Sequence, residues 1–206
     1  MMRLYVSARS PFVREVLVAL CELGLAGAVE LVPVLVRMDQ PNETVLATNP
    51  LGKIPALILG DGSTVCGTLP IIDELDRRAD GHLLPTARVE RSWHLRHQAV
   101  SHGLLEVLVL WRNERDKPPA QQTAGWLANF EVKTANTLDV LERTIPEIEG
   151  TSFGLAHVSL AALAFYLDFR FAALEWRATR PRLAAWAAQV SERASVREAA
   201  ALADAM

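Results

Sequence analysis

A serine and a proline stand at the start of an apolar run in the segment ARSPFVREVLVAL, residues 8–20. Apolar residues repeat there at helical spacing, which places Ser10 at the N-terminus of a helix that begins with Pro11. Backbone N–H groups and a partial positive charge converge at such a point and stabilise anions, including thiolates. A serine hydroxyl does not ionise there, but it can donate a hydrogen bond to a sulfur anion that a cosubstrate supplies. The alternative is that Ser10 only caps the helix.

Cysteine chemistry of the chain's own is not expected. A redox motif C-x-x-C at the start of this helix would place cysteines at positions 10 and 13. Those positions hold Ser10 and Val13, so dithiol chemistry is excluded there. The two cysteines, Cys21 and Cys66, lie far apart and form neither a metal-ligand spacing nor a disulfide framework. Cys66 is expected to be a small buried hydrophobic residue, the alternative being a functional thiol. No metal site is predicted.

A second candidate segment is NPLGKIPAL, in which Pro55 enters a predicted strand. Proline is unusual at such a position. A cis Ile54-Pro55 peptide bond would explain it, because it turns the backbone N–H and C=O of Ile54 outward. The segment is therefore a candidate edge for binding an extended peptide.

Composition describes an ordinary globular protein. The chain has 206 residues, half of them apolar, and a net charge of −3, which gives no electrostatic reason to expect nucleic acid or an anionic membrane as a partner. The N-terminus lacks a secretory pattern, and the apolar stretch Leu160–Leu167 is too short to span a bilayer. A soluble, cytoplasmic protein is expected.

The first eighty residues alternate between strand and helix patterns. Strands are predicted at residues 3–6 and 29–34, helices from Pro11 to a stop at Gly24 and from Leu69 to Arg78, and a hairpin around the GDG turn of KIPALILGDGSTVCG. A polar loop before the hairpin has room for one helical turn. This order, β-α-β, loop, β-β-α, predicts a compact α/β domain over residues 1–80.

From about Thr86 strand patterns vanish and long helical patterns follow. Helices are predicted at residues 87–116, 121–144 (ending before Pro146), 157–174 and 181–193, followed by a short tail. We expect an all-helical domain over residues 87–206. Asp168 and Arg170 are expected to form a polar pair, since charges in so apolar a helix need partners.

Three segments in order, LYVSARSPFVREVLVAL, NPLGKIPAL and AFYLDFRFAALEWRATRPRLAAW, resemble bacterial cytosolic glutathione S-transferases over nearly the whole chain. The resemblance implies a thioredoxin-like N-terminal domain and an all-α C-terminal domain. It also implies an enzyme that conjugates the glutathione thiolate to an electrophilic, mostly apolar substrate. Glutathione would be the cosubstrate, and the protein would be a homodimer.

The resemblance also implies roles for individual residues. Ser10 matches the serine that holds the glutathione sulfur. Ile54 and Pro55 match the residue before a cis-proline and that proline, where backbone groups pair with the cysteinyl part of glutathione. Lys53 matches a polar position that often reaches a carboxylate of the tripeptide.

Thr68 and Leu69 align with an acidic residue and a serine that hold the γ-glutamyl amine and carboxylate in the family. The backbone N–H of Leu69 can still bind a carboxylate, but the missing hydroxyl and charge predict glutathione binding weaker by about tenfold or more. This motivates an alternative function, a non-catalytic binding or regulatory protein that has lost tight glutathione binding. A third possibility is an enzyme for another thiol, with Lys53 or Arg9 compensating.

The helical domain offers three further candidates for binding the second substrate. His102 stands where related chains commonly have an acidic residue; it either faces the second substrate or is a partly exposed helix histidine. Glu106 and Trp111 follow on the same helix and are candidates for the acceptor pocket or the subunit boundary. Ser159 is followed by Ala162 rather than aspartate, so the capping box of the family's central helix is predicted to be missing.

Overall fold

The computed structural model describes all 206 residues, and its contacts divide them into two units. One unit comprises Met1–Thr86 with Glu192–Met206, and the other comprises Ala87–Ser191. The sequence analysis assigned residues 87–206 to a single helical domain. In the structure the last fifteen or so residues group with the N-terminal unit instead, because the C-terminal helix α9 (Ala194–Asp204) packs on α1 (Pro11–Glu22).

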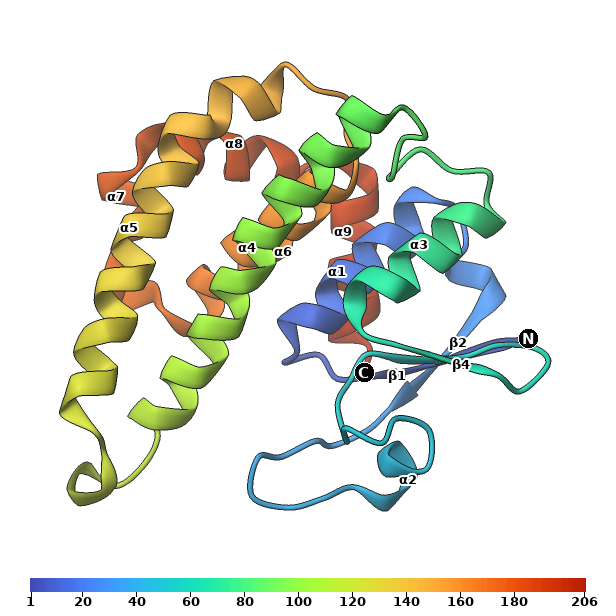
Figure 1. Cartoon of the computed structure of the whole chain (residues 1–206), viewed down its shortest axis with the longest axis horizontal. Helices are drawn as coiled ribbons and strands as arrows, with labels where there is room; N and C mark the ends of the chain where they lie inside the picture. Colours follow the sequence, from blue (N-terminus) through green and yellow to red (C-terminus); the bar gives the residue numbers. More distant parts are fainter. The chain divides into compact units, whose positions relative to one another are not determined.

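The first unit is built on a four-stranded sheet with the order β2-β1-β3-β4 (Figure 1). The strands are β1 (Met2–Val6), β2 (Val29–Pro33), β3 (Ala56–Ile58) and β4 (Thr64–Cys66). The first two strands are parallel, because α1 returns the chain to the same end of the sheet. The other neighbouring pairs, β1 with β3 and β3 with β4, are antiparallel.

Helices cover both faces of this sheet. Figure 1 shows α1 and α3 (Thr68–Arg78) on one face and the short α2 (Glu43–Leu46) on the other. Successive strand residues point to opposite faces. Tyr5 and Ile58 accordingly form a core cluster with Val45 of α2. The predicted β-α-β, loop, β-β-α order is confirmed.

Local sequence signals set the ends of these elements. Gly24 has a φ of 68°, and the N–H of Leu25 donates to the carbonyl of Leu20 at 2.8 Å, so the predicted glycine stop of α1 is confirmed. In the predicted hairpin, the N–H of Leu59 donates to the carbonyl of Ser63 at 2.8 Å across the GDG turn.

The second unit is entirely helical. Its helices are α4 (Arg88–Arg115), α5 (Ala124–Glu149), α6 (Leu155–Arg170), α7 (Trp176–Thr179) and α8 (Pro181–Ser191). Helix α6 is its centre: residues 154–164 are all buried, and the helix packs against α4 and α8. No single helix is long and apolar enough to cross a membrane, although α6 and the segment Ala172–Thr179 pass that test jointly across a 94° bend.

The predicted bounds of two helices in this unit are wrong. Helix α5 was expected to stop before Pro146 but continues to Glu149, because Ile145 and Ile148 are both 1% exposed and their burial holds the last turn in place. The helix predicted at residues 157–174 begins earlier, at Leu155, and ends at Arg170.

The N-terminus of α6 also differs from the prediction. Ser159 lies inside the helix, and Gly154 is the residue that precedes its first turn. The N–H of Gly154 donates to Nδ1 of His157 at 3.2 Å, so one of the two bonds of a capping box is present, with a histidine ring as the acceptor.

The expected pair between Asp168 and Arg170 is wrong. Asp168 instead accepts hydrogen bonds from Arg177, at 3.0 Å from Nε and 2.7 Å from Nη2, and from Nε1 of Trp176 at 2.9 Å. Residues 168 and 170 are two apart on a helix and therefore face different directions, whereas the turn after α6 brings residue 177 back to Asp168.

Candidate functional site

The sheet register brings three predicted site segments to one end of the sheet. Tyr5 of β1 is paired with Ala56 of β3, and Ala56 is paired with Cys66 of β4, so these three residues form a row across the sheet. The chain leaves β1 and β4 and enters β3 at this row. The loop to Ser10, the Ile54-Pro55 segment and the start of α3 therefore lie together beyond the same sheet end.

Ser10 caps α1 and keeps its hydroxyl proton for another acceptor. It precedes the helix with extended backbone angles, φ −86° and ψ 118°, and its Oγ accepts the N–H of Val13 at 3.3 Å. The cap uses a lone pair of the oxygen, whereas stabilising a thiolate would use its O–H as a donor. The two roles considered for Ser10 are therefore compatible with each other.

The Ile54-Pro55 peptide bond is cis, as the sequence analysis expected. Ile54 lies just outside the β-ladder, which begins at Ala56, so the sheet does not use the backbone N–H and C=O of Ile54. An extended peptide can pair with such groups. The neighbouring Lys53 is exposed, and Pro55 is buried.

Sequence analysis missed Asn49, which holds this segment in place. Its side chain is 3% exposed; Nδ2 donates to the carbonyl of Lys53 at 2.8 Å, and Oδ1 accepts the N–H of Leu51 at 3.1 Å. These bonds fix the backbone immediately before Ile54. The dipeptide Asn49-Pro50 is a turn signal and could have drawn attention to this residue.

The start of α3 is a second point where an anion can bind. Gly67 precedes the helix with a φ of 91°, and Thr68 and Leu69 are its first two residues. Their N–H groups have no acceptor within the helix, because the intrahelical bonds begin with the N–H of Ile71, which donates to Gly67 at 3.1 Å. Thr68, 5% exposed, places a hydroxyl residue at this first position.

Cys66 fits the expectation of a small apolar residue, with a side chain that is partly rather than fully buried. It packs beside the cluster of Tyr5, Val45 and Ala56, and burial raises the pKa of its thiol above the ordinary value. Its Sγ lies 3.8 Å from the carbonyl of Thr48. A thiol with a raised pKa is a poor nucleophile near neutral pH.

The three candidates on α4 do not share one face. His102 is partly buried, and Glu106, four residues later, is exposed on the same side of the helix. Trp111 is nine residues from His102, which turns it to the opposite side, where its ring packs 5.1 Å from that of Phe171. Within the helical unit, Trp111 is therefore part of the contact between α4 and the end of α6.

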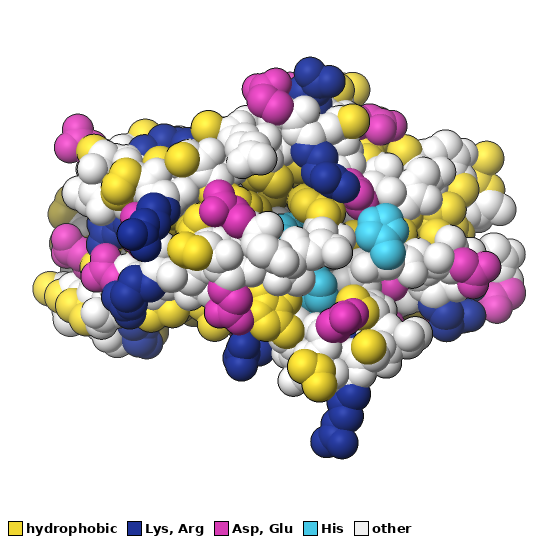
Figure 2. All heavy atoms as spheres, turned by 90° about the horizontal axis from the view of Figure 1, so that it is seen from above, with side chains coloured by type: hydrophobic (Ala, Val, Ile, Leu, Met, Phe, Trp, Pro, Cys, Tyr) yellow, Lys and Arg dark blue, Asp and Glu magenta, His cyan; other side chains and the backbone are white.

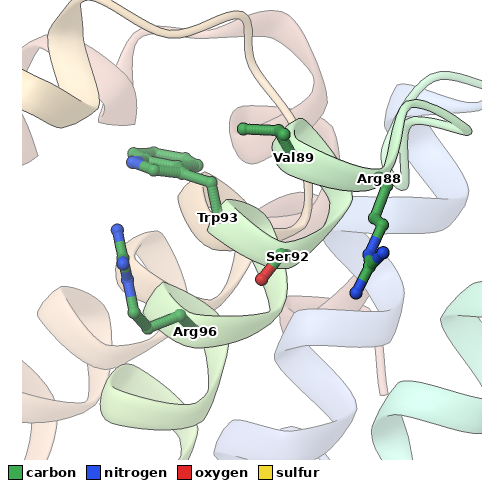
Figure 3. Close-up of a pocket in the computed structure, with 5 residues that line it drawn as sticks. All are labelled: Arg88, Val89, Ser92, Trp93 and Arg96. Atoms are coloured by element: carbon green, nitrogen blue, oxygen red, sulfur yellow. The ribbon is translucent and has the colours of Figure 1, made fainter.

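A surface hollow also lies outside these segments. The first turns of α4 line a hollow of about 430 Å³ with Arg88, Val89, Ser92, Trp93 and Arg96, none of them a predicted site residue (Figure 3). No group of three or more His, Cys, Asp or Glu side chains is arranged to hold a metal ion. On the face drawn in Figure 2, acidic and basic side chains are interspersed.

Comparison with known proteins identifies the family of this chain. Residues 4–82 match the family model of the glutathione S-transferase N-terminal domain, and residues 124–189 match that of the C-terminal domain. The uncharacterized GST-like protein YibF of Escherichia coli K12 is 30% identical over 188 residues, which cover 88% of this chain and 90% of YibF. The chain belongs to the glutathione S-transferase family.

Solved structures of family members show the same fold. A glutathione transferase family member from Pseudomonas fluorescens Pf-5 with bound glutathione is 35% identical, with a TM-score of 0.92 over 96% of this chain and 97% of that one. A Pseudomonas fluorescens Pf-5 family member with bound S-(propanoic acid)-glutathione is 34% identical, with a TM-score of 0.88 and the same coverage. The predicted fold class, a thioredoxin-like domain with an all-α domain, is confirmed.

Proposed function

We propose that this glutathione S-transferase family member is an enzyme that conjugates glutathione to an electrophilic, mostly apolar substrate. The observation that carries the proposal is the common sheet end at which Ser10, Ile54 and the start of α3 meet. Relatives with bound glutathione and with a bound S-substituted glutathione support the same ligand class.

In this proposal the tripeptide binds along the backbone of Ile54, and its γ-glutamyl carboxylate accepts the N–H groups of Thr68 and Leu69. Lys53, exposed beside this edge, attracts another carboxylate of the peptide. The glutathione sulfur lies against Ser10. Asn49 acts as a positioning residue, because it holds the backbone on which Ile54 is presented.

The reaction then needs little from the protein beyond an anion site and proximity. The glutathione thiol loses its proton to water, and the Ser10 O–H together with the N-terminus of α1 stabilises the thiolate. The thiolate attacks an electrophilic carbon, a C–S bond forms, and the electron pair of the broken bond leaves with the departing group. His102 and Glu106 are the proposed contacts of the second substrate in the helical unit.

The test is a pH titration of bound glutathione with variants that separate the two roles of Ser10. Ser10→Ala removes both the cap and the donor. Ser10→Asp keeps a good cap but replaces the donor with a negative charge. We expect both variants to raise the pKa of the bound thiol by at least about one unit, since a hydrogen bond to a charged group contributes about 1.5–3 kcal/mol. Thiolate absorbance reports the titration.

The control ligand is S-methylglutathione, which has no thiolate to stabilise. Its affinity should be nearly unchanged in Ser10→Asp. An unchanged thiol pKa in both variants would contradict the role of Ser10. Binding of glutathione without any conjugation of a broad electrophile panel would favour the alternative, a non-catalytic binding protein, which the absence of an acidic residue at Thr68 and Leu69 motivates.

We also propose the homodimer and the cytoplasmic location that the family resemblance implies. Sedimentation velocity tests the dimer, and a monomer mass at micromolar concentration would contradict it. Fractionation of the producing cell tests the location.

A further inference from the structure

A cluster of cationic side chains lies where the C-terminal ends of α4 and α6 meet. Arg112 and Arg115 come from the last turns of α4, and Arg170 is the last residue of α6. Nη1 of Arg115 donates to the carbonyl of Arg170 at 3.3 Å, which ties the two ends together. All three cations lie close enough to Tyr166, which is 2% exposed, to affect its phenol electrostatically.

Two of these arginines lack an acidic partner. The only hydrogen bond from Arg112 goes to the neutral side chain of Asn113, and the guanidinium of Arg170 stacks on the ring of Phe169 at 4.1 Å. The Nε atoms of Arg112 and Arg170 are inaccessible and have no hydrogen-bond acceptor, and neither has Nδ2 of Asn113. Three buried donors in one cluster therefore remain unsatisfied, which is costly for a folded protein.

The acidic residues near this cluster bind partners other than Arg112 and Arg170. Glu114 accepts from Lys117 and from the N–H of Thr123 at 2.6 Å, and Asp168 is bound to Arg177. Asp116 lies 3.6 Å from Arg115. The cluster therefore keeps a positive excess at Arg112 and Arg170.

We propose that Arg112 and Arg170 form an anion-binding site of the helical unit that takes a small organic carboxylate. A planar guanidinium matches a carboxylate geometrically and can donate two parallel hydrogen bonds to it. The exposed ring of Phe169, on which Arg170 stacks, suits a carboxylate with an apolar body. The proposal does not depend on glutathione binding, because all of these residues belong to the unit Ala87–Ser191.

The test uses the full chain with benzoate as the probe and benzamide as its neutral counterpart of similar shape. Calorimetry at low ionic strength should show benzoate binding at least about tenfold more tightly than benzamide. Arg112→Gln and Arg170→Gln should each weaken benzoate binding about tenfold. Arg143→Gln is the matched control, since Arg143 is an exposed arginine on α5 of the same unit, and should leave the affinity unchanged.

Three results would overturn the proposal: no benzoate binding to the wild type, equal affinity for benzoate and benzamide, or an equal loss in Arg143→Gln. Displacement of benzoate by saturating glutathione would overturn it as well, because the probe would then occupy the proposed glutathione site. If Arg112→Gln does not fold, Arg112→Lys keeps the charge without the planar fork. It should weaken binding severalfold, and full affinity in that variant would contradict the bidentate geometry.

Discussion

Two buried histidines, His94 of α4 and His157 of α6, predict that acid destabilises the helical unit. Nδ1 of His94 accepts the N–H of Ala156 at 3.3 Å, and Nδ1 of His157 accepts the N–H of Gly154 at 3.2 Å. With Nδ1 as the acceptor, Nε2 of His157 carries the proton and donates to the carbonyl of Ile148 at 3.0 Å. A protonated ring has no acceptor nitrogen, so protonation of either histidine breaks a bond to a buried N–H.

The magnitude follows from the pKa of His94. Burial lowers this pKa from 6.5 to about 4, and the neighbouring His157 and His97 act in the same direction. The other charged groups nearby are Glu147 and Arg96, which are 3.5 Å apart, and Glu147 also lies 3.6 Å from His97.

Between pH 6.5 and about 4 the unfolded chain binds a proton at residue 94 that the folded chain does not. Above pH 6.5 the ionisation of His94 therefore costs the folded protein nothing. As the pH falls, the unfolding free energy decreases, and the decrease levels off at about 3 kcal/mol below pH 4.

The perturbation is His94→Gln, whose side-chain oxygen can still accept the N–H of Ala156 but does not titrate. All five tryptophans lie within Ala87–Ser191, so tryptophan fluorescence during urea unfolding reports this unit alone. We expect the variant to be about 1 kcal/mol less stable at pH 7, and the gap to close and reverse as the pH falls to 4. His82→Gln, which changes an exposed histidine of the other unit, is the control. Identical pH dependence of wild type and His94→Gln would refute the argument.

Three further predictions concern the N-terminal unit. Thr68→Val removes a hydroxyl at the start of α3 and should weaken glutathione binding about tenfold, whereas Leu69→Ser adds a hydroxyl there and should strengthen binding. Calorimetry measures both affinities, and unchanged values would argue against a carboxylate bound at this helix start. Asn49→Ala should lower the unfolding free energy by about 1–3 kcal/mol and also weaken glutathione binding. Unchanged affinity for glutathione in this variant would exclude a positioning role for Asn49. Burial acts to raise the pKa of Glu22, but hydrogen bonds from Arg193 and Ser195 outweigh it and hold the pKa below 4.5. Unfolding titrations should therefore show wild type losing stability relative to Glu22→Gln as the pH falls below about 4.5, and a constant difference would contradict this linkage.

Much of the N-terminal unit was predictable because its signals are local. A cap such as Ser10, a glycine stop at Gly24 and the GDG turn each depend on backbone geometry within a few residues. The candidate segments around Ser10 and Ile54 could be found in the same way. The role of Asn49 could not, because its two hydrogen bonds depend on how the loop closes over the buried side chain.

The sequence by itself determined the element types, their order and the positions where an anion or a peptide could bind, since these follow from propensity, capping and turn chemistry over short spans. Tertiary structure decided which partners the buried polar groups have. Asp168 binds Arg177 rather than Arg170, His157 caps α6, the tail forms α9 against α1, and α5 passes through Pro146. In each case the free energy of burial or of a long-range hydrogen bond outweighs the local preference, and contacts between segments distant along the chain cannot be read from their own residues.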